Sequence, residues 1–344
     1  MKTLQTSERK ESDLKKSLKR HIGFFVKYIT IKKAINLAVS LIEMKLKIKK
    51  VHSYPSYLRV EVSAVCNLKC PGCILSVKQN LSGEEIKINK PFMNFEEFKD
   101  NIQDFLPYLL KVNLYDEGEP YLNKEINKIV RYLHDHKVAT CISTNFSIKF
   151  KDEDLLDIVN SGLDHLIVAV DGIDQQSYSE YRVGGNYNLV INNIKRLIEH
   201  IAKTKSRLKI EFQFLDFNDS AEMRQQAKQL AEELGVWRFN VIRDVSRGGL
   251  LKQKFTGTKE ERMKAGCYQI WLSGSITSTG NFYACDYGED SGFDALGSAA
   301  KYSYQNLMNH NNMKELRQGF SDVSKMNNVC THCILTAKKN NSIA

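Results

Sequence analysis

The sequence predicts an α/β fold, a partial (β/α)6 TIM-like barrel followed by a smaller C-terminal domain. Short apolar runs alternate with amphipathic stretches six times between residues 57 and 243. Such alternation predicts a parallel sheet with right-handed crossovers, and six repeats are too few for a closed eight-fold barrel. The alternation stops near residue 247, where Arg247, Gly248 and Gly249 open a linker.

Each predicted element follows from its own residue pattern. Strands are expected at the short apolar runs 57–63, 111–115, 138–143, 165–170, 208–214 and 236–242. Helices are expected at the amphipathic stretches 94–106, 123–135, 152–160, 187–203 and 219–234. Residues 76–92 predict a surface loop, and beyond residue 247 we expect short strands, turns and one helix near 311–319. The chain therefore divides into an extension (1–50), a core domain (51–246) and a C-terminal domain (247–344).

The net charge is confined to the N-terminal extension. The 344 residues carry 50 Lys and Arg against 40 Asp and Glu. Residues 1–50 hold 14 of the basic and 4 of the acidic side chains, so the other 294 residues hold 36 of each. A large nucleic-acid groove needs clustered basic side chains to neutralise phosphates, so the neutral body argues against nucleic-acid binding.

The extension contains a basic amphipathic helix. Lys33 falls on the side opposite the apolar face of this helix, and Lys27 and Lys32 lie at the flanks. The apolar face could dock on the exterior of the barrel, or the helix could lie on an anionic membrane surface or meet a partner protein. The residues of that apolar face, at intervals of four and three, are Phe24, Tyr28, Ile31, Ile35, Ala38 and Ile42.

The sequence predicts neither export nor a membrane span. The longest N-terminal apolar run, 34–42, is bounded by Lys33 and Glu43 and falls short of the roughly 18 apolar residues that a spanning helix needs. The charged start lacks the order of a secretory signal. We therefore expect a cytoplasmic protein, with peripheral membrane contact through residues 1–50 as one interpretation of the extension.

Seven of the eight cysteines fall into two groups, and the first group predicts a metal centre. Cys66, Cys70 and Cys73 form a CxxxCxxC loop directly after the first predicted strand. In a reducing compartment such groups are more often metal sites than disulfides. Three thiolates can hold three irons of a four-iron four-sulfur cluster and leave the fourth iron open to a small molecule. Zinc is the competing metal and would need a distant fourth ligand.

This loop, placed after the first strand of a partial βα barrel, strongly resembles the mark of the radical S-adenosylmethionine (SAM) superfamily. The resemblance implies a SAM-binding 4Fe-4S cluster on Cys66, Cys70 and Cys73. It further implies reductive cleavage of SAM to methionine and a 5′-deoxyadenosyl radical, which takes a hydrogen atom from a substrate. A reductase such as flavodoxin or ferredoxin is the implied electron donor. The residue before the last cysteine, often aromatic in the family, is Gly72 here.

Three further segments at successive strand ends match the family in the expected order. Segment 118–120 is similar to the family's GGEP segment, which meets the SAM amino group, except that Glu117 replaces its first glycine. Segment 143–145 resembles one that contacts polar groups of SAM, and segment 181–185 is similar to one whose arginine can face the SAM carboxylate. The implied SAM contacts are Gly118, Glu119, Pro120, Ser143, Asn145 and Arg182.

The second cysteine group supplies four thiolates, from Cys267, Cys285, Cys330 and Cys333. A hairpin over 270–284 would bring the first two together. The resemblance extends here, because the group looks like the shortened auxiliary-cluster domain called twitch, related to the seven-cysteine SPASM domain. It implies a second, auxiliary 4Fe-4S cluster. A zinc ribbon uses the same ligands and is the alternative.

The number of cysteine ligands in the second group indicates which reaction the enzyme carries out. Four thiolates saturate a cluster, so the auxiliary cluster suits electron transfer better than substrate binding. Removal of a hydrogen atom, an electron and a proton oxidises a substrate by two electrons, which favours dehydrogenation, for example of an alcohol carbon to a ketone. Twitch-bearing dehydrogenases of aminocyclitol biosynthesis have a similar arrangement of four cysteines, and this resemblance implies a hydroxylated small molecule such as a sugar or cyclitol as the substrate. Asp171 and Arg243 are catalytic candidates at strand ends. Asp171 could instead cap a helix before Ile173, and Arg243 could pair with Asp244.

Cys141 supplies the main alternative mechanism. It lies two residues before Ser143, so both side chains point to the same face of the third strand. If Cys141 faces the substrate, it could return a hydrogen atom and make the enzyme an epimerase; otherwise it is a small core residue. A peptide-modifying maturase and a cluster-bearing sensor without turnover are the remaining alternatives.

Overall fold

The computed structural model describes residues 27–76, 88–216, 220–243, 258–260, 263, 266–285, 293–331 and 333. Most of the predicted surface loop over 76–92, and the linker that begins at residue 247, lie outside these described residues.

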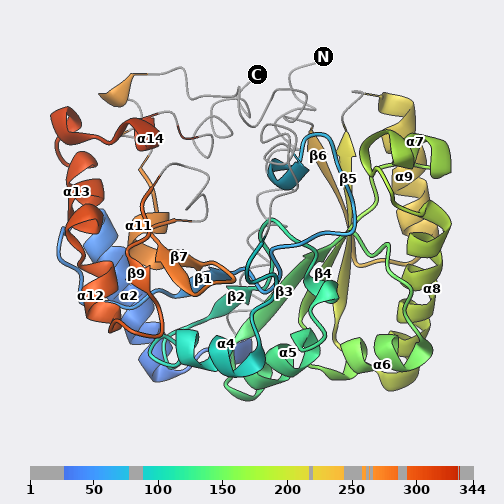
Figure 1. Ribbon diagram of the computed structural model, residues 1–344, viewed down its shortest axis with the longest axis horizontal. Helices are drawn as coiled ribbons and strands as arrows, with labels where there is room; N and C mark the ends of the chain where they lie inside the picture. The colour runs from blue at the N-terminus through green and yellow to red at the C-terminus, as the bar shows by residue number, and fades with distance from the viewer. Residues whose placement is uncertain are drawn as a thin grey trace, which may run out of the picture.

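Within the described residues, an open sheet of nine strands has the order β6-β5-β4-β3-β2-β1-β7-β8-β9 (Figure 1). Strands β1 to β6 each pair in parallel with the next. Their bounds are Tyr57–Val60, Lys111–Asn113, Ala139–Thr144, His165–Ala169, Lys209–Asp216 and Arg238–Arg243. The prediction of six parallel strands in a barrel that does not close is confirmed.

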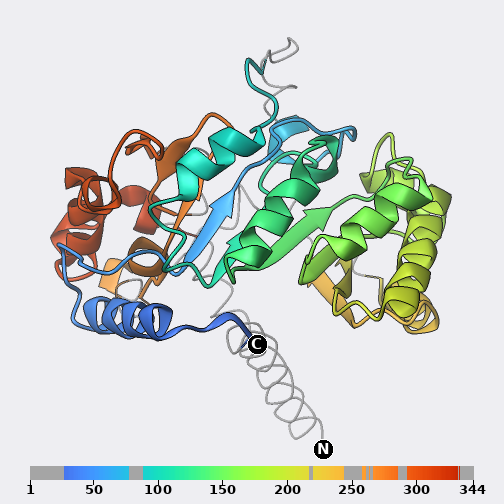
Figure 2. The same cartoon turned by 90° about the horizontal axis from the view of Figure 1, so that it is seen from below.

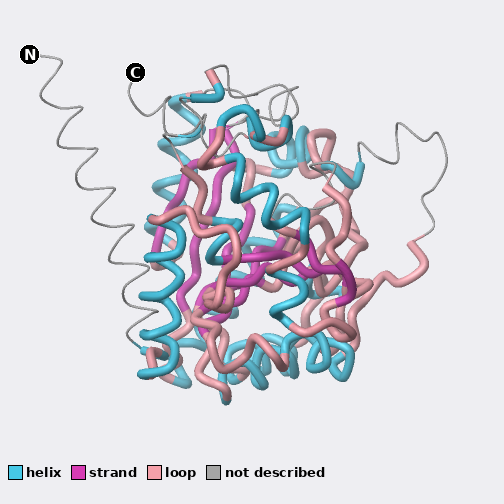
Figure 3. The backbone as a smooth tube through the Cα atoms, turned by 90° about the vertical axis from the view of Figure 1, so that its left-hand side faces the viewer, coloured by secondary structure: helices cyan, strands magenta, loops and turns pink. Residues whose placement is uncertain are grey.

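Helices cover the outer face of this sheet (Figures 2 and 3). The apolar side chains between the sheet and these helices are buried. On β1, Leu58 and Val60 point outward and are fully buried in the core. Asn94 caps the first of these helices, because its side chain accepts from the Glu97 amide and Glu97 returns a bond to the cap. The helices are α4 (Phe95–Ile102), α5 (Ile126–Asp135), α6 (Asp152–Asn160), α7 (Gln175–Tyr181), α8 (Tyr187–Thr204) and α9 (Ala221–Glu233).

The inner face of the open barrel carries polar side chains. Since side chains alternate along a strand, Tyr57 and Arg59 point away from the outer helices, and both are half-buried. The register places Asn113 beside Arg59, and the Asn113 amide donates to the Tyr57 hydroxyl at 2.6 Å. Further members of this face, on β3, β5 and β6, are Ser143, Gln213 and Asn240.

The C-terminal part extends the same sheet. Its strand β7 (Ser273–Ile276) pairs in parallel with β1, a neighbour that the sequence did not predict. Phe282 stacks on Phe105 with 5.8 Å between ring centroids, so the two parts share one apolar core. The expected hairpin and the helix near 311–319 are confirmed. The remaining elements are β8 (Asn281–Tyr283), β9 (Gly297–Ser298), α11 (Gln269–Leu272), α12 (Tyr304–Met308), α13 (Asn311–Gly319), η3 (Val323–Lys325) and α14 (Asn328–Thr331).

Helix α2 (Ile31–Lys45) packs on the body through its polar face, so the alternative in which its apolar face docks on the barrel is wrong. Asn36 accepts from the Tyr54 amide at 2.7 Å and donates to the Tyr54 carbonyl at 2.9 Å. Glu43 accepts from the Ser53 hydroxyl at 2.5 Å. These polar side chains satisfy backbone groups of the body that an apolar face would leave unpaired. Of the predicted apolar face, Tyr28 is buried, Ile31, Ile35, Ala38 and Ile42 are exposed, and Phe24 lies outside the described residues.

The residues that follow α2 are tied to the C-terminal helices. The buried Arg317 guanidinium donates to the carbonyl of Lys49 at 3.0 Å, and the Trp271 indole donates to the carbonyl of Ile48 at 3.0 Å. The domain boundary expected at residue 50 therefore falls inside a packed region. No helix in the described part of the chain is both long enough and apolar enough to cross a membrane.

The buried Lys33 predicts that folding stability depends on pH. It is 2 % exposed and its ammonium donates to the Lys137 carbonyl, and burial together with nearby Lys137 lowers the Lys33 pKa from 10.5 to about 8. Between those values the unfolded chain keeps a proton that the folded chain has released, so folding stability rises with pH. Between pH 8 and pH 10.5, we expect the free energy of unfolding of the wild type, measured in urea, to rise by about 1–3 kcal/mol more than that of Lys33→Met. Parallel profiles for the two proteins would contradict the assignment.

Candidate metal centre and active site

The first cysteine group lies just beyond the carboxyl end of β1, where three later segments of the chain hold it by hydrogen bonds. The Glu119 amide, after β2, donates to the Val65 carbonyl at 2.8 Å. Asn67 donates to the Ser147 carbonyl, after β3, at 2.9 Å. The Lys69 amide donates at 3.0 Å to a carbonyl in the loop after α7, that of Val183. Carboxyl ends of parallel strands share one edge, which is why separate sequence segments meet here.

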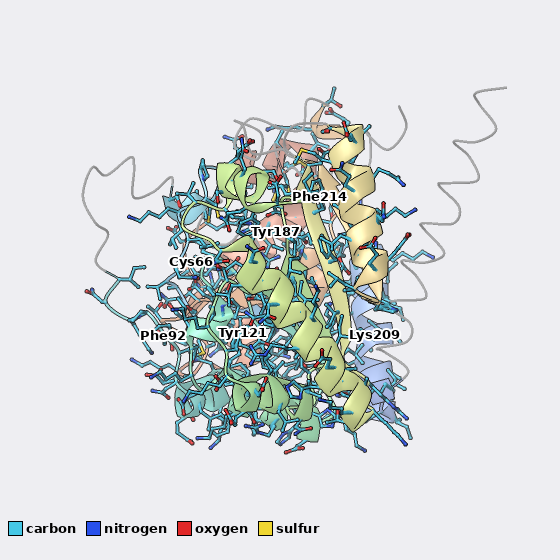
Figure 4. The ribbon with its side chains drawn as sticks, turned by 90° about the vertical axis from the view of Figure 1, so that its right-hand side faces the viewer. Cys66, Phe92, Tyr121, Tyr187, Lys209 and Phe214 are labelled. Atoms are coloured by element: carbon cyan, nitrogen blue, oxygen red, sulfur yellow. The ribbon has the colours of Figure 1, made fainter. Side chains whose placement is uncertain are left out.

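Within the loop, N–H groups point at two of the three sulfur atoms. The Cys66 sulfur accepts from the Leu68 amide at 3.4 Å and from the Asn145 side chain at 3.6 Å (Cys66 is labelled in Figure 4). The Cys70 sulfur accepts from Arg182 at 3.7 Å. A turn closes the loop, because the Cys73 amide donates to the Cys70 carbonyl at 3.0 Å. The segments that the sequence singled out are thus brought around the cysteines.

Gly118 allows the β2 loop to approach the cysteine loop. A Cβ atom at this position would lie 2.2 Å from the Ser63 carbonyl oxygen and 2.7 Å from that of Val65. Real Cβ atoms do not come this close to backbone, so any side chain must push the two loops apart.

Gly118→Ala is therefore expected to lower the free energy of unfolding by about 2–3 kcal/mol, because the added methyl group overpacks fixed backbone. Chemical denaturation of the cluster-free protein measures the change. Gly235→Ala is the matched control: Gly235 has a φ of +71° and nothing within 4 Å of its Cβ position, so only its backbone cost of about 1 kcal/mol applies. Equal stability of Gly118→Ala and wild type would refute the close approach.

Glu119 joins the loop after β2 to the end of β3. It is buried, and its carboxylate accepts from the Thr144 hydroxyl at 2.7 Å, the Asn145 amide at 2.7 Å and the Tyr121 amide at 3.1 Å. Burial raises the Glu119 pKa, while these three donors oppose the rise. The next residue, Pro120, begins the short helix η1 (Pro120–Leu122). The described contacts of Glu119 therefore stabilise the fold around the cysteine loop.

Asp171 holds Arg182 against the cysteine loop. Asp171 is fully buried after β4, and its carboxylate accepts from the Leu215 amide at 2.7 Å and forms an ion pair with the Arg182 guanidinium. Arg182 in turn reaches Cys70. The N-cap of α7 is Asp174 and not Asp171, so the capping alternative is wrong. With both oxygen atoms engaged, Asp171 fits a positioning role better than that of a general base.

Cys141 does lie on the inner face with Ser143, as predicted, but it has a partner that sequence reasoning missed. Its sulfur lies 3.4 Å from Nδ1 of His165, whose Nε2 lies 3.2 Å from the Glu211 carboxylate, and all three side chains are buried. Burial disfavours the charged forms, yet the attraction between the partners outweighs it, so the Cys141 pKa is lowered and the His165 pKa is raised. The strand register, Cys141 beside His165, is the signal that could have found this pair.

Two members of the second cysteine group lie at the amino end of β7, away from the carboxyl end of β1 that carries the first group. Cys267 precedes α11, which leads into β7, and Cys285 follows β8, where its carbonyl accepts from the Ser275 hydroxyl at 2.8 Å. The Cys333 amide approaches the Cys330 carbonyl at 3.4 Å, so these two share a turn.

One sequence-predicted catalytic candidate is placed only in part. The β6 backbone ends at Arg243, whose side chain, like all of Asp244, lies outside the described residues.

The first cysteine loop suits a cluster in its donor chemistry. Burial raises the pKa of the Cys66 thiol to about 11 and also raises that of Cys70, so a metal must displace the thiol protons at neutral pH. The N–H donors described above would then stabilise anionic sulfur. Among the described residues, no three His, Cys, Asp or Glu side chains converge on a point that could hold a single metal ion. A four-iron cluster takes one thiolate per iron, so its ligands need not converge.

The open parallel barrel with a three-cysteine loop at the carboxyl end of β1 defines a cluster-binding class of βα protein. Residues 60–208 match the family model described as the Radical SAM superfamily. The matched segment, which contains the three-cysteine loop and covers less than half of the chain, is a radical SAM domain.

Curated relatives match part of the chain. A GTP 3′,8-cyclase of Vibrio parahaemolyticus is 28% identical over 155 residues, which cover 44% of this chain and 44% of that protein. A probable GTP 3′,8-cyclase of Methanococcus maripaludis is 26% identical over 148 residues, or 41% of this chain and 45% of that protein. The chain thus spans less than half the length of these relatives.

Solved structures share the fold over more of the chain. SuiB of Streptococcus suis superposes with a TM-score of 0.60 at 15% identity, covering 82% of this chain and 72% of its own. The same protein bound to SAM gives 0.60 at 17% identity, covering 78% and 69%. The protein anSMEcpe with bound AdoMet gives 0.52 at 14% identity, covering 74% and 82%. These likenesses bear on the fold alone.

Proposed function

We propose that the chain is a radical SAM enzyme that cleaves SAM reductively and dehydrogenates a hydroxylated small molecule. The observation that carries the proposal is the loop of Cys66, Cys70 and Cys73, held by two strand-end loops and the loop after α7, with N–H donors at two of its sulfur atoms. A four-iron cluster bound there supplies one electron to SAM and an open iron to hold it. A reductase of the flavodoxin or ferredoxin type is the proposed source of that electron.

The residues around the loop would bind SAM and keep it in place. Ser143 is half-buried on the inner face of β3, and Asn145 and Arg182 already contact cysteine sulfurs. Arg182 carries the positive charge that a SAM carboxylate would meet, and Asp171 holds it in its orientation. The segment after β2, which consists of Gly118, Glu119 and Pro120, would complete the surface that binds SAM.

The polar inner face supports a substrate rich in hydroxyl groups. Tyr57, Arg59, Asn113 and Ser143 offer both donors and acceptors along neighbouring strands. The buried Asn113 Oδ1 has no hydrogen-bond partner among the described residues. The donors and acceptors on this face match the hydrogen-bonding groups of a sugar or cyclitol.

The second cysteine group supports oxidation as the outcome. Removing a hydrogen atom from an alcohol carbon, followed by one proton and one electron, yields a carbonyl product. We assign the electron to an auxiliary 4Fe-4S cluster on Cys267, Cys285, Cys330 and Cys333. The β7–β8 hairpin sets two of these cysteines at one end of the sheet, and the Cys330–Cys333 turn pairs the other two.

One other substrate class has an observation in its favour. The curated relatives are GTP 3′,8-cyclases, which favours cyclisation of a purine nucleotide as the second candidate. Epimerisation is less well supported, because Cys141 is 1 % exposed and its sulfur is already paired with His165. Modification of a peptide substrate is supported only by the similarity of fold to solved structures. A cluster-binding sensor that catalyses no reaction is the alternative that is not an enzyme.

Product analysis tests the proposal. Anaerobically reconstituted, reduced protein should release 5′-deoxyadenosine from SAM and, with C-deuterated polyols, carry deuterium into it while a ketone forms. Deuterium from labelled GTP alone would move the assignment to nucleotide cyclisation, and solvent deuterium in an unoxidised product would indicate epimerisation. If SAM is cleaved with none of these substrates, the sensor without turnover is the remaining alternative.

Metal analysis tests the second cluster separately. Two clusters predict about eight irons per chain, and Cys330→Ala with Cys333→Ala should leave about four. Zinc in place of the second set of irons would reject the auxiliary cluster while leaving SAM cleavage untouched.

A further inference from the structure

Helix α2 lies on the outside of the molecule (Figure 2). It presents an apolar face to solvent. Positions 31, 35, 38 and 42 share one side of the helix, and Leu46 continues it past the last helical residue. Large apolar side chains are rarely left this open in a row. Their exposed fractions are 83% for Ile31, 60% for Ile35, 57% for Ile42 and 65% for Leu46.

Hydrogen bonds to the rest of the protein fix this orientation of α2. Lys33, Asn36, Ser40 and Glu43 form the buried face of α2, and three of them bond to the body at separate points along the helix. Rotating the helix to bury the isoleucines would break all of these bonds. The exposed apolar row is therefore a stable feature of the fold.

The charges beside the row are positive. Glu43 is the one acidic residue among residues 27–50, and it is buried with its carboxylate bonded to the body. Lys47 is half-buried, and the other three lysines that follow the row are exposed. These four lysines at the C-terminal end of α2 and just beyond it are Lys45, Lys47, Lys49 and Lys50.

We propose that α2 is a membrane-surface anchor that lies flat on an anionic lipid bilayer. From Ile31 to Leu46 the helix is about 24 Å long at 1.5 Å per residue, so the row can enter the headgroup boundary along its whole length. The lysines at its end meet lipid phosphates. The combination of an apolar row with basic exposed charge matches anionic lipid, which attracts each lysine and accepts the apolar side chains.

Vesicle flotation of the full-length protein tests the proposal. Wild type should float with vesicles of phosphatidylcholine plus phosphatidylglycerol, and not with phosphatidylcholine alone. Ile35→Ser with Ile42→Ser should weaken binding at least about ten-fold, because it removes two inserted side chains. Lys45→Gln with Lys50→Gln should weaken it about ten-fold at low salt and little at high salt.

The controls separate this surface from general stickiness and from misfolding. Leu156→Ser removes an exposed leucine on α6, 37% exposed, and should bind vesicles like wild type. Each variant should keep the circular dichroism spectrum of wild type; Ile31→Ser, the most exposed position, serves if the double variant unfolds. Equal flotation of the isoleucine variants and wild type would overturn the proposal. So would a dimer in light scattering that these variants dissociate, without vesicle binding, since the row would then bind a second copy.

Discussion

Cys70→Ala is expected to abolish cleavage of SAM, with a loss of more than about a hundred-fold. Changes around a metal ligand already cost up to about that much, and this change removes a ligand itself. Cys70 is the most buried of the three loop cysteines and the one that Arg182 contacts at 3.7 Å. Iron content and 5′-deoxyadenosine release after anaerobic reconstitution measure the effect.

Cys141→Ala is the matched control for that experiment. It also removes a buried cysteine, but one that lies on β3 and pairs with His165. It should keep the full iron content, whereas Cys70→Ala should lose about four irons. Undiminished SAM cleavage by Cys70→Ala would show that the loop does not hold the cluster.

Asp171→Asn is expected to lower the free energy of unfolding by about 3–5 kcal/mol, the range for breaking one partner of a buried ion pair. The asparagine amide oxygen could still accept from the Leu215 amide, but the Arg182 guanidinium would lose its counter-charge in a buried setting. Denaturant unfolding of the cluster-free protein measures the change, and a weaker affinity for SAM should accompany it.

The Arg59–Asp116 pair provides the control for Asp171→Asn. It has the same chemistry at 3.0 Å, but both side chains are partly exposed. Exposed pairs contribute about 0–1 kcal/mol, so Asp116→Asn should change stability little. A double Asp171→Leu, Arg182→Met variant should regain stability relative to Asp171→Asn, because no unpaired charge is left buried. Equal effects of Asp171→Asn and Asp116→Asn would contradict the burial argument.

The site was predictable where covalent spacing or strand order decides proximity. Cys66, Cys70 and Cys73 share one short loop, so their proximity needs no tertiary information. Segments 118–120 and 143–145 follow successive parallel strands, whose carboxyl ends must share an edge. Arg182 was singled out only through the family resemblance, because its contact with Cys70 depends on where α7 ends and not on spacing or strand order.

Other parts of the site depended on pairing that a single sequence does not reveal. Asp171 was expected to act in catalysis or to cap a helix, and it instead binds Arg182, the residue at the C-terminal end of α7. His165 was not singled out, since its link to Cys141 exists only in the register of β3 with β4. The parallel pairing of β7 with β1 brings together strands more than 200 residues apart, beyond the reach of local patterns.

The sequence by itself determined the βα repeat, the open barrel and the superfamily, because hydrophobic period and cysteine spacing are local properties. It also determined which residues of α2 share a face. Only the tertiary structure decided which face meets the body, and it chose Lys33, Asn36 and Glu43 over the isoleucines. The physical reason is that the body offers backbone carbonyl and amide groups at that surface, and buried polar groups require partners that apolar side chains cannot supply.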